Sequence, residues 1–408
     1  MPYVAFGQDK IEFDLAPGDT LTEKEPGFDA ADWSREAFYQ SLQQVQFGEL
    51  VASGKMLVAV NDAFRPTPTG QILSLLKTWF PDFRADFIVA CGNHPAPDSA
   101  DLDIIFAGYE LPGEVRIFAH NSRDLDSLRL VGELDGHPLY LNRHLFEYPA
   151  VLTIGSVEPH YFAGFTGGRK SLIPGLSDME SCRRNHALAV SPEARPLRLK
   201  GNPVAEHFDR LLTLVNIPNL ISVQIVAARG QHIINCFAGD IKQSFAKAAV
   251  LAEQVYSFTC PRTYDLVIAE MRPPLDRNLY QLQKAIENTA PAVRDGGTVV
   301  AVSTCSNGIG NDEFYNLAAR LGNEEMVLSH ADMENPPLGI HKLSRIVRLA
   351  RRIKVKALTG LASEIVRRVF IEPAMSLDAE IQALKEESKK TVDILLVRDA
   401  GLLVAKLD

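Results

Sequence analysis

One short loop of the chain concentrates residues that could carry chemistry. The segment 159–175 contains His160, Lys170 and Ser171 together with several glycines, and His186 follows soon after. Glycine allows positive φ angles and a close approach of the backbone to a ligand. The apolar segment 151–155 precedes the loop, as expected for a strand whose carboxyl end meets a ligand in an open α/β sheet. Lys170 fits three roles: a nucleophile, a covalent anchor and a phosphate clamp.

The phosphate-clamp role rests on a near match to a nucleotide-binding motif. Residues 164–171 read Gly-Phe-Thr-Gly-Gly-Arg-Lys-Ser, but Arg169 stands where the motif Gly-x4-Gly-Lys-Ser needs its second glycine. A nucleoside triphosphatase is therefore disfavoured. The chain also lacks His-Glu-x-x-His, Gly-x-Ser-x-Gly and a strict Gly-x-Gly-x-x-Gly motif.

Polar residues also follow two apolar segments near the N-terminus. Asp62 and Arg65 come after segment 56–60, and His94 comes after segment 87–91. An arginine at a strand end can fork onto a carboxylate or a phosphate, and a histidine titrates near neutral pH. Each has a plainer interpretation, in which Arg65 is a surface residue of a proline-rich turn and His94 is an ordinary loop histidine.

Further candidates lie later in the chain. Gln281 and Lys284 are three residues apart in a helical pattern and so share a face. Taken alone, the pair is more simply interpreted as part of a solvent-exposed helix surface. A glycine-containing loop at 303–310 suits a phosphate. The imidazole of His186 could ligate a metal, while a structural histidine is the simpler interpretation of its surroundings.

Alternating strand and helix patterns must position these residues. Helical periods such as 70–80 and 241–256 separate the strands, which is typical of parallel sheets with helices on both faces. Thr69 stands where it would cap the helix 70–80. The short apolar segments that predict buried strands are 56–60, 87–91, 151–155, 220–226, 266–269, 298–302 and 394–397.

Length and composition narrow the class of protein. The 408 residues favour two domains, and we place the boundary at about residue 260, giving α/β domains at 1–260 and 261–408. The net charge of −9 argues against a nucleic-acid partner. No signal peptide or membrane-spanning run is evident, and five widely spaced cysteines fit reduced thiols. We therefore expect a cytoplasmic protein without a membrane partner.

Taken together, the motifs resemble those of the lactate racemase family, whose members carry a nickel-pincer nucleotide. The resemblance spans roughly residues 1–400 and implies two α/β domains with the active site in the cleft between them. It favours the covalent anchor among the three roles of Lys170. The motifs are His160-x9-Lys170-x15-His186, Asp62-x-x-Arg65-Pro66, His94 after a glycine, and Gln281-x-x-Lys284.

The resemblance implies how the cofactor is held. Lys170 would form a thioamide link to the pyridinium-3-thioamide-5-thiocarboxylic acid mononucleotide. His186 would bind its nickel ion, and a neutral imidazole suits such a square-planar site. The residues that would position the nucleotide are Asp62, Gly164, Gly167 and Gly168.

The resemblance also implies how a substrate is processed. His94 and His160 would act from opposite faces as the two bases that a racemase needs, while the α-hydride moves to the cofactor and leaves a 2-keto acid. Arg65, Gln281 and Lys284 would hold the carboxylate and the developing carbonyl oxygen.

Departures from the family pattern bear on the substrate. This chain reads Asn93-His94-Pro95 where the family often has Thr-His-Arg, and Asn307 stands where a glutamate is common. Both tryptophans, Trp33 and Trp79, are N-terminal, so a tryptophan of the lactate enzyme's pocket has no counterpart. We therefore predict a racemase or epimerase that acts on a 2-hydroxy acid other than lactate and that relies on cofactor-synthesis enzymes.

Two alternatives stay open. One is a phosphate- or nucleotide-dependent transferase that uses Lys170 and Ser171 as a clamp. The other is a non-catalytic protein that binds a hydroxy acid or a nucleotide. Two histidines together with Arg65 and Lys284 disfavour the second alternative, because binding alone needs no pair of bases.

Overall fold

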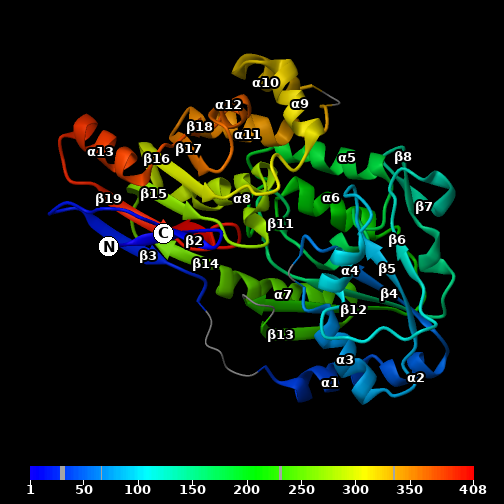
Figure 1. Cartoon of the computed structure of the whole chain (residues 1–408). Coiled ribbons are helices and arrows are strands. Elements are labelled where there is room, and N and C mark those ends of the chain that lie inside the picture. The colour runs from blue at the N-terminus through cyan, green and yellow to red at the C-terminus, as the bar shows by residue number, and fades with distance from the viewer. Residues whose placement is uncertain (28–32, 66, 229–231, 334–335) are drawn as a thin grey trace.

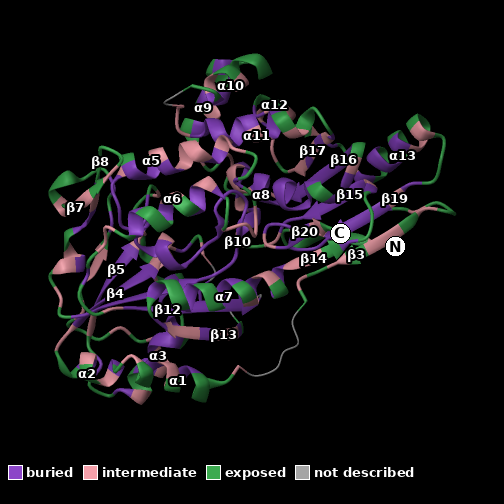
Figure 2. Ribbon diagram, turned by 180° about the vertical axis from the view of Figure 1, so that it is seen from behind, coloured by how far each residue is buried: buried purple, intermediate pink, exposed green. Residues whose placement is uncertain are grey.

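The computed structural model describes the chain except for residues 28–32, 66, 229–231 and 334–335. The described residues form two six-stranded sheets and several two-stranded pairs (Figure 1). Helices cover the sheets, and the strands of both sheets are largely buried (Figure 2).

The first sheet is nearly all parallel. Neighbouring strands in this sheet run parallel, except that β13 (His232–Gly239) is antiparallel to β12 (Leu220–Ala228). Alternate side chains of the central strand β4 enter different cores: Met56, Val58 and Val60 pack with α1 (Arg35–Gln44) and α3 (Thr69–Trp79), whereas Leu57 and Ala59 pack with α6 (Pro203–Leu212). The strand order is β13 (His232–Gly239), β12 (Leu220–Ala228), β9 (Val151–Ser156), β4 (Met56–Asn61), β5 (Ala85–Ala90) and β6 (Ile117–Ala119).

The second sheet is parallel throughout and contains an N-terminal strand. β3 (Thr20–Lys24) pairs with β19 (Asp393–Val397), and Val4 and Phe13 lie in the same core as α13 (Leu377–Ser388). The range 1–260 drawn from the sequence therefore includes a segment that pairs with the second sheet. The strand order is β18 (Glu372–Pro373), β17 (Lys354–Thr359), β16 (Val293–Ser303), β15 (Tyr264–Glu270), β19 (Asp393–Val397) and β3 (Thr20–Lys24).

Two helices of the second domain matter for the site. α8 (Leu279–Thr289) and α11 (Ile340–Ala350) pack in one core with α9 (Asp312–Leu321). α7 (Ile241–Tyr256) packs on β12 and leads into β14 (Ser257–Cys260), which pairs with β20 (Val404–Leu407). The remaining helices and strands are β1 (Tyr3–Phe6), β2 (Asp9–Glu12), α2 (Phe47–Ala52), α4 (Ser99–Ile105), β7 (Leu128–Leu134), β8 (His137–Asn142), β10 (Pro159–His160), β11 (Gly164–Phe165), α5 (Met179–Ala187), α10 (Glu324–Ala331) and α12 (Ser363–Arg368).

The fold class and the strands predicted from the sequence are confirmed. The seven predicted segments appear as β4, β5, β9, β12, β15, β16 and β19. The predicted cap was wrong, because α3 begins at Thr69 itself, whose side chain is buried inside the first turn. Among the described helices, none combines the length and apolarity that crossing a membrane requires.

Candidate active site

One cavity gathers most of the residues singled out from the sequence. Loops at the carboxyl ends of β4, β5 and β9 form one side, and α8 and α11 of the second domain contribute to the other. The predicted residues that line it are Asp62, Arg65, His94, His160, Gly167, Lys170, His186, Gln281 and Lys284. Pro66, which belongs to the Asp62–Arg65 motif, lies outside the described residues.

The strand order explains why two histidines share this cavity. β4 lies between β9 and β5. His160 follows β9, His94 follows β5, and Asp62 and Arg65 follow β4 between them. Because the carboxyl ends of parallel strands meet at one edge of the sheet, the two imidazoles approach the cavity from either side of the β4 loop.

His94 has a carboxylate partner. Its Nδ1 lies 2.6 Å from Oδ2 of Asp62, and its ring lies 4.8 Å from that of Phe64, measured between centroids. A carboxylate that accepts from Nδ1–H leaves the lone pair on Nε2 free to take a proton. Sequence reasoning assigned Asp62 to nucleotide binding and missed this contact, which arises because β4 and β5 are neighbours in the sheet.

His160 is almost completely buried. Burial holds its pKa well below the ordinary value, and the positive charges of Lys170 and Arg65 lower it further. Its ring packs edge-on against Phe162 at 4.5 Å and stacks near Tyr161 at 5.1 Å. The imidazole is therefore neutral at neutral pH, and its Nδ1 accepts a hydrogen bond from the backbone N–H of Ala163 at 3.3 Å.

Lys170 lies in a short 3-10 turn, Gly168–Ser171. Burial lowers its pKa to about 7, and the nearby guanidinium of Arg65 contributes. Its Nζ lies over the rings of Phe162 and Phe208, at 5.7 and 5.1 Å from their centroids. No carboxylate of the described residues forms an ion pair with it. A substantial fraction of this amine is unprotonated near pH 7, which suits covalent attachment.

His186 projects from α5, which begins after the N-cap Asp178. Its Nδ1 lies 2.8 Å from the carbonyl oxygen of Cys182, one turn earlier, so Nδ1–H donates and Nε2 keeps a free lone pair. Burial lowers its pKa to about 3. Phe162 packs edge-on against this ring at 5.1 Å. The imidazole is thus neutral and oriented, as a metal ligand must be.

The glycines of the loop divide into two groups. Gly167 lines the cavity, but Gly164 and Gly168 do not. A Cβ on Gly164 would lie 2.3 Å from the carbonyl oxygen of Arg198, and one on Gly168 would lie 2.6 Å from the ring of Phe245. The N–H of Gly168 donates to Oε1 of Gln224 at 2.7 Å. A Cβ on Gly167 would likewise lie 2.6 Å from Cγ2 of Val157, so chain packing accounts for all three of these glycines without a ligand.

The second domain adds cations to the cavity. Gln281 and Lys284 lie in the first half of α8, after the N-cap Asn278. Burial lowers the pKa of Lys284 to about 7, and Arg65 lowers it further. Lys342 of α11 also lines the cavity, and burial lowers its pKa well below the ordinary value. The 303–310 loop does not line it.

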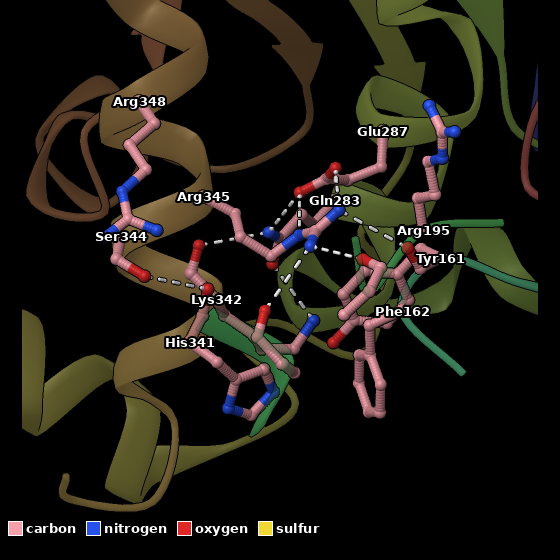
Figure 3. Close-up of polar contacts among 12 residues, drawn as sticks. Tyr161, Phe162, Arg195, Gln283, Glu287, His341, Lys342, Ser344, Arg345 and Arg348 are labelled. Atoms are coloured by element: carbon pink, nitrogen blue, oxygen red, sulfur yellow. Dashed lines mark hydrogen bonds and ion pairs between the residues drawn. The ribbon is translucent and has the colours of Figure 1, made fainter. Parts of the chain in front are cut away.

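Sequence reasoning missed Lys342, together with Tyr161, Phe162 and Tyr280. The signal for Lys342 was weak, because it is a polar residue on the buried side of an amphipathic helix. Its importance is visible only where α11 meets α8 (Figure 3).

Comparison with known proteins finds two family models, one matching the N-terminal part of the chain and one the C-terminal part. Residues 6–196 match the lactate racemase N-terminal domain, and residues 262–404 match the lactate racemase C-terminal domain. The chain is 26% identical over 328 residues to a lactate racemase of Thermoanaerobacterium thermosaccharolyticum, covering 76% of each chain. It is 25% identical over 371 residues to a lactate racemase of Lactiplantibacillus plantarum, covering 87% of each.

Solved structures support the same fold. The lactate racemase apoprotein of T. thermosaccharolyticum superposes with a TM-score of 0.86 at 21% identity, over 99% of both chains. A protein of Thermotoga maritima superposes with a TM-score of 0.70 at 16% identity, over 91% of this chain and 98% of the other. With domain models that match at both ends, this chain belongs to the lactate racemase family, a family of isomerases.

Proposed function

We propose that this protein racemises or epimerises a 2-hydroxy acid by reversible hydride transfer, through a 2-keto acid, with a nickel-pincer nucleotide tethered to Lys170. The observation that carries the proposal is the position of His94 and His160 on either side of the β4 loop in one cavity with Arg65 and Lys284. A racemase needs a base for each enantiomer, and a carboxylate substrate needs cations.

The residues fit the cofactor. The amine of Lys170 has a pKa lowered to about 7, so much of it is uncharged near neutral pH, and Lys170 is the candidate for the covalent link. His186 presents a neutral Nε2, since its Nδ1 is engaged with the Cys182 carbonyl, and is the candidate nickel ligand. Gly167 lies beside them and would face the nucleotide. When bound, the cofactor supplies a reversible acceptor for the α-hydride.

The chain's own residues then account for binding and proton transfer. Arg65 and Lys284 would neutralise the substrate carboxylate and stabilise the negative charge that develops on the hydroxyl oxygen. Gln281 would be a neutral hydrogen-bond partner. His94, held by Asp62, would take the hydroxyl proton of one enantiomer, and His160 would take that of the other. The aromatic wall of Tyr161, Phe162 and Tyr280 would limit access of water to the reacting carbon.

The transferase alternative has less support. A phosphate clamp at Gly164–Ser171 would use free backbone N–H groups, yet that of Gly168 is bound by Gln224. The guanidinium of Arg169 lies near Asp209, with Nε 2.9 Å from Oδ1, and over the ring of Phe245. Both contacts engage this segment with the rest of the chain, which leaves it less suited to binding a phosphate.

The test uses protein produced together with the cofactor-synthesis enzymes. Intact-mass and metal analysis should find the cofactor's added mass and nickel, and single enantiomers of 2-hydroxy acids should equilibrate to mixtures. The variant Lys170→Ala should carry no adduct. An adduct that persists in this variant would overturn the assignment of Lys170, and loaded protein that turns over no hydroxy acid would refute the proposed reaction.

A further inference from the structure

The buried lysine of α11 has a defined place in the wall of the cavity. Lys342 is 2% exposed, and its Nζ donates to the carbonyl oxygen of Tyr280 at 3.0 Å and to Oε1 of Gln283 at 3.1 Å. Nζ also lies over the rings of Tyr280 and Tyr161, at 4.0 and 4.6 Å from their centroids. The amino group is thus enclosed by α8, α11 and the His160 loop.

A network of hydrogen bonds fixes this position. Nε2 of Gln283 donates to the carbonyl oxygen of Lys342 at 3.0 Å and to Oε1 of Glu287 at 3.1 Å, so the amide must turn Oε1 toward Nζ. Glu287 in turn accepts two hydrogen bonds from Arg345, at 2.8 and 2.7 Å (Figure 3). Glu287 is therefore paired with Arg345, and the hydrogen-bond acceptors of Lys342 Nζ are both neutral.

Lys342 consequently has no counter-charge in the described part of the free protein. An ammonium group has three N–H donors, and two are bound by carbonyl oxygens. No carboxylate of the described residues forms an ion pair with it. Because burial without a counter-charge lowers the pKa of Lys342 well below its ordinary value, a ligand carboxylate is the partner that would restore the ammonium form and accept its third N–H.

The other cations of the cavity already have partners under the proposed function, on which this inference rests. Lys170 would be consumed by the cofactor link, and Arg65 and Lys284 would bind the carboxylate and the hydroxyl oxygen. We propose that Lys342 binds a second carboxylate, carried by the substrate's side chain, and that the substrate is a 2-hydroxy dicarboxylate. Lys342 is then a specificity-determining residue.

The first experiment compares two probes that differ only in charge. Cofactor-loaded protein is given malate (2-hydroxybutanedioate) and its 4-amide, and kcat/KM is measured for each. We expect malate to be preferred by about tenfold to a hundredfold, the range of one charge-assisted hydrogen bond. Equal values for the two probes, or a preference for the amide, would overturn the inference and leave the proposed racemase intact.

A variant locates the preference. Lys342→Gln keeps a hydrogen-bond donor but removes the charge, so the malate-to-amide ratio should fall close to one, mainly through KM for malate. Lys354→Gln, on β17 of the same domain and outside the cavity, should keep the wild-type ratio. An unchanged ratio in Lys342→Gln would refute the role of this residue.

Binding separates this inference from the proposed reaction. Citramalate (2-hydroxy-2-methylbutanedioate) has no α-hydrogen and cannot be racemised, whereas 2-hydroxyisobutyrate also lacks the second carboxylate. Calorimetry on the loaded protein should give at least tenfold tighter binding of citramalate, and Lys342→Gln should abolish the difference. Tight citramalate binding without turnover of any hydroxy acid would support the substrate class and refute the racemase. Equal binding of both would refute the substrate class.

Discussion

Asp62 Oδ2 lies 2.6 Å from Nδ1 of His94, so the carboxylate after β4 sets the orientation of the imidazole after β5. The two strands are neighbours in the sheet, paired from Met56–Ala85 to Asn61–Ala90. The contact thus follows from parallel register, since both residues leave the sheet at the same edge. A carboxylate in this position also stabilises the imidazolium that forms when the base takes a proton.

We expect Asp62→Asn to lower kcat by about 10²- to 10⁴-fold, because an amide can hold the ring but cannot stabilise its charge or fix the productive tautomer. Nickel content and the covalent mass should stay at wild-type levels. Asp98→Asn, which retains a cap on α4 outside the cavity, is the matched control and should keep full activity. A loss of cofactor from Asp62→Asn would instead assign Asp62 to the nucleotide, as the sequence first indicated.

Mutation should separate the covalent link at Lys170 from nickel binding at His186. In His186→Ala, Lys170 can still form the covalent link, but nickel retention should fall by more than about tenfold, since the oriented imidazole is gone. Metal analysis and intact mass on the same sample measure the two properties. His207→Ala removes a half-buried histidine outside the cavity and should retain nickel. Full nickel occupancy in His186→Ala would exclude His186 as the ligand.

Most of the site's first-domain half could be predicted because it depends on local order along the chain. Polar residues that follow buried strands in a parallel sheet must meet at one edge, so Asp62, Arg65, His94 and His160 reach one cavity. Gly164 and Gly168 show the limit of this reasoning. A glycine that a ligand needs and a glycine that packing needs look alike until the neighbouring chain is known.

The second-domain half depends on tertiary packing that no local pattern reports. Lys342 and Arg345 lie on the buried side of α11, where a sequence pattern predicts apolar residues. Their roles come from Gln283 and Glu287 on another helix. Likewise, β3 joins the second sheet by pairing with β19 near the opposite end of the chain, which no nearby residue signals.

The pH dependence of kcat/KM should reflect Lys284. Its ammonium form is the one that binds a carboxylate, and burial together with Arg65 lowers its pKa to about 7 in the free protein. A lowered pKa means that the charge is present below about pH 7 and is lost above it, so kcat/KM should decline as the pH rises through that range. Lys284→Arg keeps its charge at higher pH and should shift the decline upward. An unchanged profile in this variant would assign the decline to another group.

Arg345 should prove essential to the contact between the domains. From α11 it donates to Glu287 on α8 and, at 2.6 Å, to the carbonyl oxygen of Ala194 in the first domain. Arg345→Met leaves Glu287 buried and unpaired, which should cost about 3–5 kcal/mol in the free energy of unfolding. Arg348, one turn later, also reaches the first domain through the carbonyl oxygen of Val190, but its side chain is 40% exposed. Arg348→Met should therefore cost less than about 1 kcal/mol.

The double variant Arg345→Met/Glu287→Leu tests the cause of that loss. Removing both charges takes away the uncompensated carboxylate, so most of the lost stability should return in urea unfolding. Activity should recover less than stability, because the Gln283 amide loses its Glu287 acceptor and is then oriented toward Lys342 by the carbonyl oxygen of Lys342 alone. KM for malate should be higher in the double variant than in the wild type, although the fold is restored. Recovery of both stability and KM would mean that Arg345 serves packing alone.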